Sequence, residues 1–216
     1  MNRRSLQPGL GRVAQIVVGS LLFVTLLIVG LGALLPRNWQ VEESILINAP
    51  AASVHAWVGD LRRWPRWAQW NQVELWPQNR VSDPSTGPGA TLRWYGRASS
   101  HDDLASGETR IVRSDPREGV WFESHTQGGD ASEASVRYGE RPGVTLVTWL
   151  DRGRLPPIIG GLFLDLFQKR LHEHMSTGLE RLKDLVESER RTAAASPSPS
   201  LAVQGAPASA TDAGNP

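Results

Sequence analysis

Twenty consecutive residues near the N-terminus, Ile16–Leu35, carry no charge and are mostly Leu, Val, Ile and Gly. An α-helix of this length spans about 30 Å, the thickness of the hydrocarbon core of a bilayer. A cleavable signal peptide is the alternative, because three Arg precede the run, but the apolar part of such a peptide usually has about 7–15 residues. We therefore expect an uncleaved transmembrane helix over residues 13–36, after a basic segment of residues 1–12.

The basic residues beside this run predict its orientation, because Arg and Lys concentrate on the cytoplasmic side of a membrane. Three Arg and the amino terminus precede the run, whereas Arg37 is followed by Glu42 and Glu43. The N-terminus is thus expected in the cytoplasm. The rest of the chain should lie outside, as the periplasmic domain of a single-pass inner-membrane protein if the source is a Gram-negative bacterium.

The composition excludes several classes of function. The net charge is +1, so no overall field draws the chain to nucleic acid. There is no cysteine, which rules out disulfides, thiolate metal ligands and a cysteine nucleophile. Nothing in the composition requires a cofactor, and we predict none.

The remainder of the chain divides into a linker, a domain and a tail. Residues 189–216 are rich in Ala, Ser and Pro and lack aromatic residues, so they cannot bury enough surface to offset their chain entropy and are expected to be disordered. Residues 37–40 form the predicted linker. Residues 41–188 are long enough to build one well-buried core.

Within the domain, short strand-like segments precede one long helical pattern. The segment from Val41 to about Ala49 reads as a strand, and two short helices follow, the second near Trp64. Five further strands are expected over residues 89–96, 106–114, 119–126, 134–140 and 144–151. A long helix over residues 158–188 is indicated by apolar residues that recur about every 3.6 positions: Leu164, Phe167, Leu171, Met175, Leu179, Leu182 and Val186.

This order predicts an α+β fold, in which a curved six-stranded antiparallel sheet wraps around the long C-terminal helix. Gly178, in the middle of that helix, costs about 1 kcal/mol against Ala. Its presence indicates either close packing against the sheet or space for a ligand.

The motifs and their order resemble a known superfamily. The segments are VEESILINAPAASVHAWVGDLRRWPRWAQW, GPGATLRW, GETRIVRSDP, VTLVTWLDRG and STGLERLKDLVE. Together they are similar to the START-like or Bet v 1-like helix-grip fold, and to the polyketide-cyclase-type branch of the SRPBCC superfamily, over about residues 40–188. The resemblance implies a deep apolar cavity between helix and sheet. Its members bind lipids, sterols, polyketides or plant hormones, and some are cyclases, so the fold does not define the function.

The segment AWVGDLRRWPRWAQW holds four of the nine Trp. A membrane-interface belt is disfavoured because the segment lies about thirty residues beyond the apolar run. Stacking on nucleic acid would need a basic groove, which the neutral charge balance does not provide. We expect Trp57, Trp67 and Trp70 to line one end of the cavity, as ligand contacts or as plain core, with the neighbouring Arg side chains in solvent.

One alternation per strand gives the rest of the predicted cavity lining. The predicted ligand-binding residues beyond the three Trp are Leu92, Trp94, Ile111, Phe122, Tyr138, Val147, Trp149, Phe167, Leu171 and Met175. A slip of one residue would turn a whole strand to the other face. His172 and His174 are two apart on a helix and point in opposite directions, and the other histidines lack ligand spacing, so no metal site is predicted.

Three functions remain open. The leading hypothesis is a membrane-anchored binding domain whose partners are the membrane, through residues 16–35, and a hydrophobic small molecule or lipid in the cavity. The second is a cyclase-like enzyme that uses two carboxylates among Glu108, Glu123, Asp151 and Asp165. It requires Glu108 or Glu123 to face inward, and we assign no catalytic residue. The third is an envelope scaffold that binds proteins through the domain surface and the tail.

Overall fold

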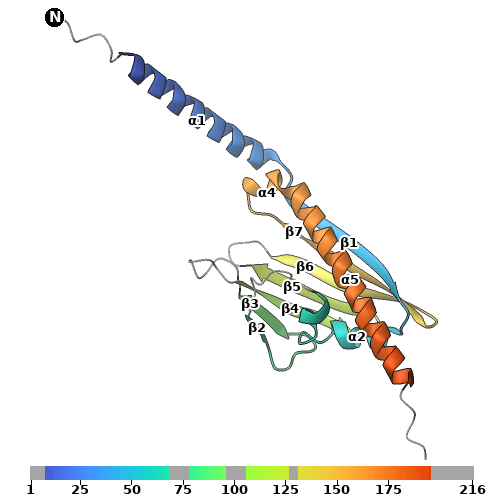
Figure 1. Cartoon of the computed structure of the whole chain (residues 1–216). Coiled ribbons are helices and arrows are strands. Elements are labelled where there is room, and N and C mark those ends of the chain that lie inside the picture. Colours follow the sequence, from blue (N-terminus) through green and yellow to red (C-terminus); the bar gives the residue numbers. More distant parts are fainter. Residues whose placement is uncertain (1–7, 69–77, 96–105, 127–130, 196–216) are drawn as a thin grey trace, which may run out of the picture.

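Residues 8–68, 78–95, 106–126 and 131–195 are described in the computed structural model. A long N-terminal helix, α1 (Pro8–Leu34), projects from a curved sheet (Figure 1). Its segment Gly11–Leu34 is long and apolar enough to cross a membrane, and only 6% of its most apolar window is buried. The apolar surface of α1 is therefore not that of a core helix packed inside a domain.

The sheet is fully antiparallel, and its strands follow the order β1-β7-β6-β5-β4-β3-β2. The strands are β1 (Asn38–Ile47), β2 (Gln78–Val81), β3 (Thr91–Tyr95), β4 (Ser106–Asp115), β5 (Gly119–Thr126), β6 (Ser132–Arg141) and β7 (Val144–Arg154). The predicted fold class is confirmed, and β2 is a seventh strand that the sequence pattern did not reveal. A register shift between Ile111 and Arg113 interrupts the β4–β5 ladder, and such bulges bend a sheet.

Two short helices, α2 (Ala51–Val58) and α3 (Trp64–Trp67), follow β1 and contact α5. The long helix α5 (Leu164–Ala195) lies across one face of the sheet (Figure 1). Its buried residues keep the predicted helical period: Leu171, Met175, Gly178, Leu179, Leu182 and Val186. The sheet face toward α5 is called the inner face below, and the space between them the groove.

The long helix differs from its predicted range at both ends. A separate short helix, α4 (Ile159–Leu162), precedes it, and α5 runs on through Ala195. The extension is held by tertiary contacts, because the Trp57 indole donates a 2.6 Å hydrogen bond to Glu189 and Arg190 donates to the carbonyl of Asn48. Composition alone does not show such contacts.

Gly178 brings α5 close to the core. A Cβ at this position would lie 3.2 Å from Cζ3 of Trp149 and 3.3 Å from the carbonyl oxygen of Trp67. Both distances are tighter than ordinary van der Waals contact. Of the two explanations for this glycine, close packing is therefore the one that the structure supports.

Candidate functional site

The groove has two ends of different character. At the α1 end, β1 begins, β7 ends and α5 begins, and the Leu155 amide donates a 2.9 Å hydrogen bond to the Arg37 carbonyl just after α1. At the far end, α2 and α3 pack against α5. Side-chain alternation along β7 sends Val147, Trp149 and Asp151 into the groove, and all three are buried.

The part of the groove beneath α3 is filled by packed aromatic rings. Trp64 and Trp67 lie edge-on at 5.7 Å between centroids. Trp64 contacts Phe122 at 4.8 Å, and Trp67 contacts Trp149 at 5.5 Å. These edge-to-face pairs add stability beyond the area that they bury. The tryptophan-rich segment thus forms part of the hydrophobic core, which is one of the two roles expected for it.

Trp57 lies at the rim of this core. It is buried, and the guanidinium groups of Arg63 and Arg66 each lie 4.8 Å from its ring centroid. The electron-rich face of the indole attracts both guanidinium cations. Arg62 and Arg66 are exposed and Arg63 is half-buried, so the expectation that these arginines face solvent holds for two of the three.

His174 is half-buried on the inner side of α5. Its ring lies 6.0 Å from that of Trp149, at an interplanar angle of 70°. Burial, which disfavours the charged imidazolium, lowers the pKa of His174 to about 4. The side chain is therefore neutral at physiological pH.

A second histidine connects α2 with the sheet. His55 lies 3.3 Å from the Tyr138 hydroxyl through Nδ1 and 3.3 Å from the Ser114 hydroxyl through Nε2. Burial lowers the pKa of His55, opposed by the charge of Asp115. Burial also raises the pKa of the Tyr138 phenol. These neutral side chains close the far end of the groove with hydrogen bonds.

At the α1 end, tryptophan side chains from the sheet pack over glycines. Trp39 packs against Phe167 of α5 at 5.1 Å between centroids, and its ring covers Gly153, where a Cβ would lie 2.7 Å from Cζ2. Trp94 covers Gly107 in the same way on the inner face of β3 and β4, near the opposite edge of the sheet. A pocket of about 780 Å³ lies beside the ends of β1, β6 and β7, but most of its side chains belong to the outward-facing alternation of these strands, and Asp151, Phe167 and Leu171 are not among them. Its walls are Asn38, Trp39, Gln40, Ala131, Glu133, Arg152, Gly153, Arg154 and Gln168.

Asp151 is a buried carboxyl group of the inner face at this end. Only 3% of its surface is exposed, and its Oδ1 has no hydrogen-bond partner among the described residues. Burial raises the pKa of Asp151 to about 7, although hydrogen bonds from the Arg152 amide and the Ser132 side chain act in the opposite direction. An unpaired buried carboxyl oxygen is costly and therefore calls for an explanation.

The register places Asp151 beside the first turns of α5. Asp151 pairs with Val41 of β1. Val41 lies between Trp39, which contacts Phe167, and Glu43, which forms an ion pair with His172. Asp151 is therefore level with the stretch of α5 that carries Phe167 and Leu171.

The predicted lining residues lie on the groove side of the structure. Buried in the core are Trp57, Trp67, Leu92, Ile111, Phe122, Tyr138, Val147, Trp149, Leu171 and Met175. Trp94 and Phe167 are half-buried, and Trp70 falls outside the described residues. The chosen strand alternation thus agrees with the register, whereas ligand contact stays a prediction.

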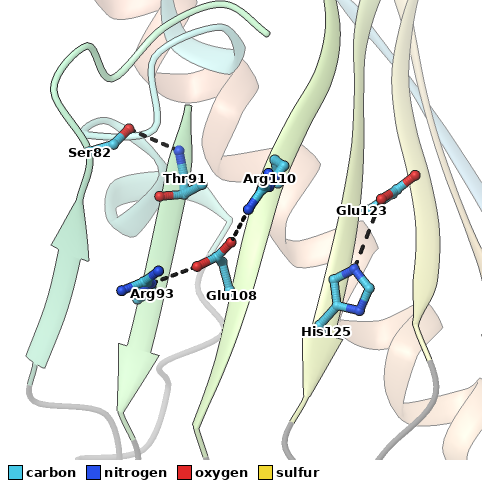
Figure 2. A network of polar contacts seen from close by, with 7 residues as sticks. All are labelled: Ser82, Thr91, Arg93, Glu108, Arg110, Glu123 and His125. Atoms are coloured by element: carbon cyan, nitrogen blue, oxygen red, sulfur yellow. Dashed lines mark hydrogen bonds and ion pairs between the residues drawn. The ribbon is translucent and has the colours of Figure 1, made fainter. Parts of the chain in front are cut away.

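Of the four carboxylates in the enzyme hypothesis, Asp151 faces the groove, whereas Glu108 and Glu123 lie on the outer face of the sheet. Glu108 faces away from α5 and bonds to Arg93 at 2.6 Å and Arg110 at 3.0 Å (Figure 2). These two guanidinium groups lower the pKa of Glu108. Glu123 lies on the same outer face, 3.9 Å from His125 (Figure 2). The prediction that one of these glutamates faces inward is wrong, because the inner positions of β4 and β5 belong to Ile111 and Phe122.

The histidines of α5 do point apart. His172 is mostly exposed and pairs with Glu43, whereas His174 packs on Trp149. Among the residues that the structure describes, no three His, Cys, Asp or Glu side chains gather closely enough to hold a metal ion.

Three residues that shape the groove were left out of the predicted lining. Asp151 shares the parity of Val147 and Trp149, which the alternation had already turned inward. His174 lies three residues after Leu171 and four before Gly178, on the buried stripe of α5. Trp64 opens α3 and is as buried as its neighbours. Each could have been found by extending the periodicity to polar side chains and to the whole Trp cluster.

Comparison with known proteins bears on both fold and family. No curated protein matches the sequence at a significant level. The fold is similar to that of TTHA0849 from Thermus thermophilus (21% identity, TM-score 0.54, covering 73% of this chain and 100% of that one). It is also similar to the Zhui aromatase/cyclase from Streptomyces sp. R1128 (14%, 0.53, 73% and 98%), and to a norcoclaurine synthase point mutant from Thalictrum flavum (9%, 0.52, 71% and 96%). At these identities the likeness shows the helix-grip fold alone.

The sequence itself provides the family assignment. Residues 38–187 match a single family, and this stretch begins at β1 and ends near the last buried turn of α5. It therefore covers the sheet, the groove and the helix that crosses it, and leaves out α1 and the C-terminal tail. The chain belongs to the family described as polyketide cyclase / dehydrase and lipid transport.

Proposed function

We propose that this chain is a membrane-anchored binding domain that holds a hydrophobic small molecule or lipid at the α1 end of its groove. The observation that carries the proposal is the position of that end. Only residues 35–37 separate α1 from β1, and three residues reach at most about 11 Å. If α1 spans the membrane, the α1 end of the groove is held beside the bilayer, where lipophilic molecules concentrate.

The chemistry of the α1 end supports such a ligand. Phe167 and Leu171 of α5 offer apolar surface here, and Phe167 is only half-buried. Asp151 lies level with this surface and has an oxygen free to accept a hydrogen bond. Binding sites for small molecules commonly combine an apolar lining with a few polar groups that fix orientation. A ligand with a hydrocarbon body and a hydroxyl or amine at one end would fit both features.

The proposed location follows from the flanking charges. The basic N-terminal segment would remain in the cytoplasm and the domain would face the periplasm or cell exterior. The family description includes lipid transport, which is consistent with a ligand taken from or delivered to a membrane.

Photolabelling of the full chain in vesicles tests this proposal. The probe is a long-chain fatty alcohol that carries a diazirine near the end of its chain. We expect it to label α1, which serves as an internal positive control, and also inner-face peptides that contain residues 147–151 and 167–175. Labelling confined to α1 would contradict the proposal.

A matched pair of variants locates the label. Leu171→Trp adds bulk at a site that is 6% exposed in the groove, whereas Leu46→Trp adds the same bulk on the outer face of β1, where the side chain is 49% exposed. We expect Leu171→Trp to reduce labelling of the inner face several-fold and to leave labelling of α1 unchanged. Leu46→Trp should leave both at the wild-type level. Equal effects of the two variants would mean that the label is not in the groove.

A further inference from the structure

We propose that the connection between β7 and α5 is a second membrane contact, in which Leu162, Phe163 and Leu166 insert into the outer interface of the same bilayer that α1 crosses. These three residues are called the apolar elbow. The inference rests on the proposed function only in taking α1 as a transmembrane helix, and it does not require a ligand.

The elbow is apolar and unburied. Leu162, Phe163 and Leu166 are 42%, 54% and 53% exposed. They are consecutive or one turn apart around the junction of α4 and α5. Single exposed apolar residues are common, but a contiguous group of large ones usually marks a binding surface.

The contacts of α4 with α1 set the depth of the elbow. A Cβ on Gly32 would lie 2.2 Å from the carbonyl oxygen of Ile158, and a Cβ on Gly161 would lie 2.6 Å from Cβ of Leu35. Gly32 belongs to the apolar segment that ends at Leu34. Because a helix rises 1.5 Å per residue, α4 lies level with the last turn of the span, and Figure 1 shows it beside the end of α1.

The depth of the elbow indicates that its binding partner is lipid. A partner protein in solution would have to reach a surface that lies at the boundary of the hydrocarbon region. Because α4 contacts the end of α1 and the elbow follows directly from α4, the bilayer that α1 crosses would also cover the elbow.

Charged side chains next to the elbow fit the same placement. Lys169 and Arg170 follow Leu166 by three and four residues, which puts them one turn further along on the same side of α5, and both are exposed. Long basic side chains just beyond an apolar patch reach lipid phosphates while their stems stay near the hydrocarbon. Asp165 is also exposed at this turn, so the basic charge is partly offset.

Insertion would fix the orientation of the groove. Phe167, the residue after Leu166, contacts Trp39 at the α1 end of the groove. With α1 as one attachment and the elbow as a second, the domain could not swing freely about residues 35–37. The α1 end of the groove would face the headgroups.

Because the chain has no cysteine, a single introduced cysteine can carry the only spin label. The full chain is reconstituted in phosphatidylcholine–phosphatidylglycerol vesicles as three variants, Phe163→Cys, Val112→Cys and Val24→Cys. Val112 is 46% exposed on the sheet and serves as the water-exposed control, and Val24 lies within α1. Collision with oxygen and with a water-soluble nickel chelate is measured for each nitroxide.

The expected result is that the label at 163 resembles the label at 24. Its collision rate with nickel should be several-fold lower than that of the label at 112, and its collision rate with oxygen higher. Leu166→Cys should repeat this result if the label at 163 perturbs the elbow. If the labels at residues 163 and 166 are as accessible to nickel as the label at residue 112, while the label at residue 24 is protected, the elbow does not insert into the membrane. The proposal that α1 is a transmembrane anchor would still hold. An accessible label at 24 would overturn both.

Discussion

Replacing Trp149 with alanine is expected to lower the free energy of unfolding by about 3–5 kcal/mol, the usual cost of removing a fully buried large aromatic side chain. Trp149 is completely buried, and it is the ring on which Trp67, His174 and the close approach at Gly178 converge. The backbone of α5 cannot relax into the space without breaking these contacts. Single domains are stable by about 5–15 kcal/mol, so the loss is a large share of the total.

Trp121→Ala is the matched control for this variant. Trp121 is a half-buried residue of β5 on the outer face, with the Arg113 guanidinium 4.3 Å from its ring centroid. Loss of such an exposed cation–π contact costs about 0.5–1 kcal/mol. Both variants are measured by urea unfolding of the full chain in nanodiscs, followed by tryptophan fluorescence, since all nine Trp lie beyond residue 37. Equal losses for the two variants would show that Trp149 is not the centre of the core.

Asp151→Asn is expected to change the pH dependence of stability more than any other single substitution in the groove. The pKa of Asp151 is about 7 in the folded chain, against a usual value of 3.8. Between these values the native state binds a proton that the unfolded state has lost, so the free energy of unfolding falls as pH rises from about 4 to 7. At 1.36 kcal/mol for each pKa unit, the penalty above pH 7 is about 4 kcal/mol.

Asparagine keeps the shape of the side chain and removes the charge. The stability of Asp151→Asn should therefore equal that of wild type near pH 4, exceed it increasingly up to pH 7, and stay about 4 kcal/mol higher at pH 8. Urea unfolding at each pH measures the difference. A difference that is constant from pH 4 to 8 would mean that Asp151 titrates normally, and would remove the buried carboxyl from the account of the groove.

His174 provides a test of opposite sign. Its pKa is about 4 in the folded chain, against 6.5, so the unfolded state binds the extra proton and stability is lost as pH falls from about 6.5 to 4. A His174→Gln variant should match wild type above pH 6.5 and be about 3 kcal/mol more stable relative to it at pH 4. In the wild type, the contributions of Asp151 and His174 to the free energy of unfolding change in opposite directions between about pH 4 and 6.5. The pH dependence of each group is therefore measured directly only in the variant that removes the other.

The sequence predicted those features of the fold that repeat with a period. The apolar stripe of α5 and the alternation of β7 are long enough for the pattern to be unambiguous. The strand β2 was missed because its residues, QNRV, are short and mostly polar. It exists through pairing with β3, and strand pairing is a tertiary contact that a local pattern does not contain.

The candidate site was predictable only in part, for a similar reason. Periodicity assigned Trp149, Leu171 and Met175 to the inner side, where the structure has them. It could not show that Trp64 and Trp67 fill the space beneath α3, because that depends on how two short helices dock. The alternation of β7 did place Asp151 on the inner side, but the level of Asp151 beside the first turns of α5 depends on the register of β7 with β1.

Native mass spectrometry of the full chain, extracted from cell membranes in mild detergent, tests the central claim most directly. If the groove holds a lipophilic molecule, wild type and Leu46→Trp should carry an adduct of defined mass that Leu171→Trp lacks. The adduct should dissociate with organic solvent and be identifiable from its fragments. A wild-type chain that is bare as isolated, and still bare after incubation with a lipid extract, would contradict the claim that this domain binds a hydrophobic ligand.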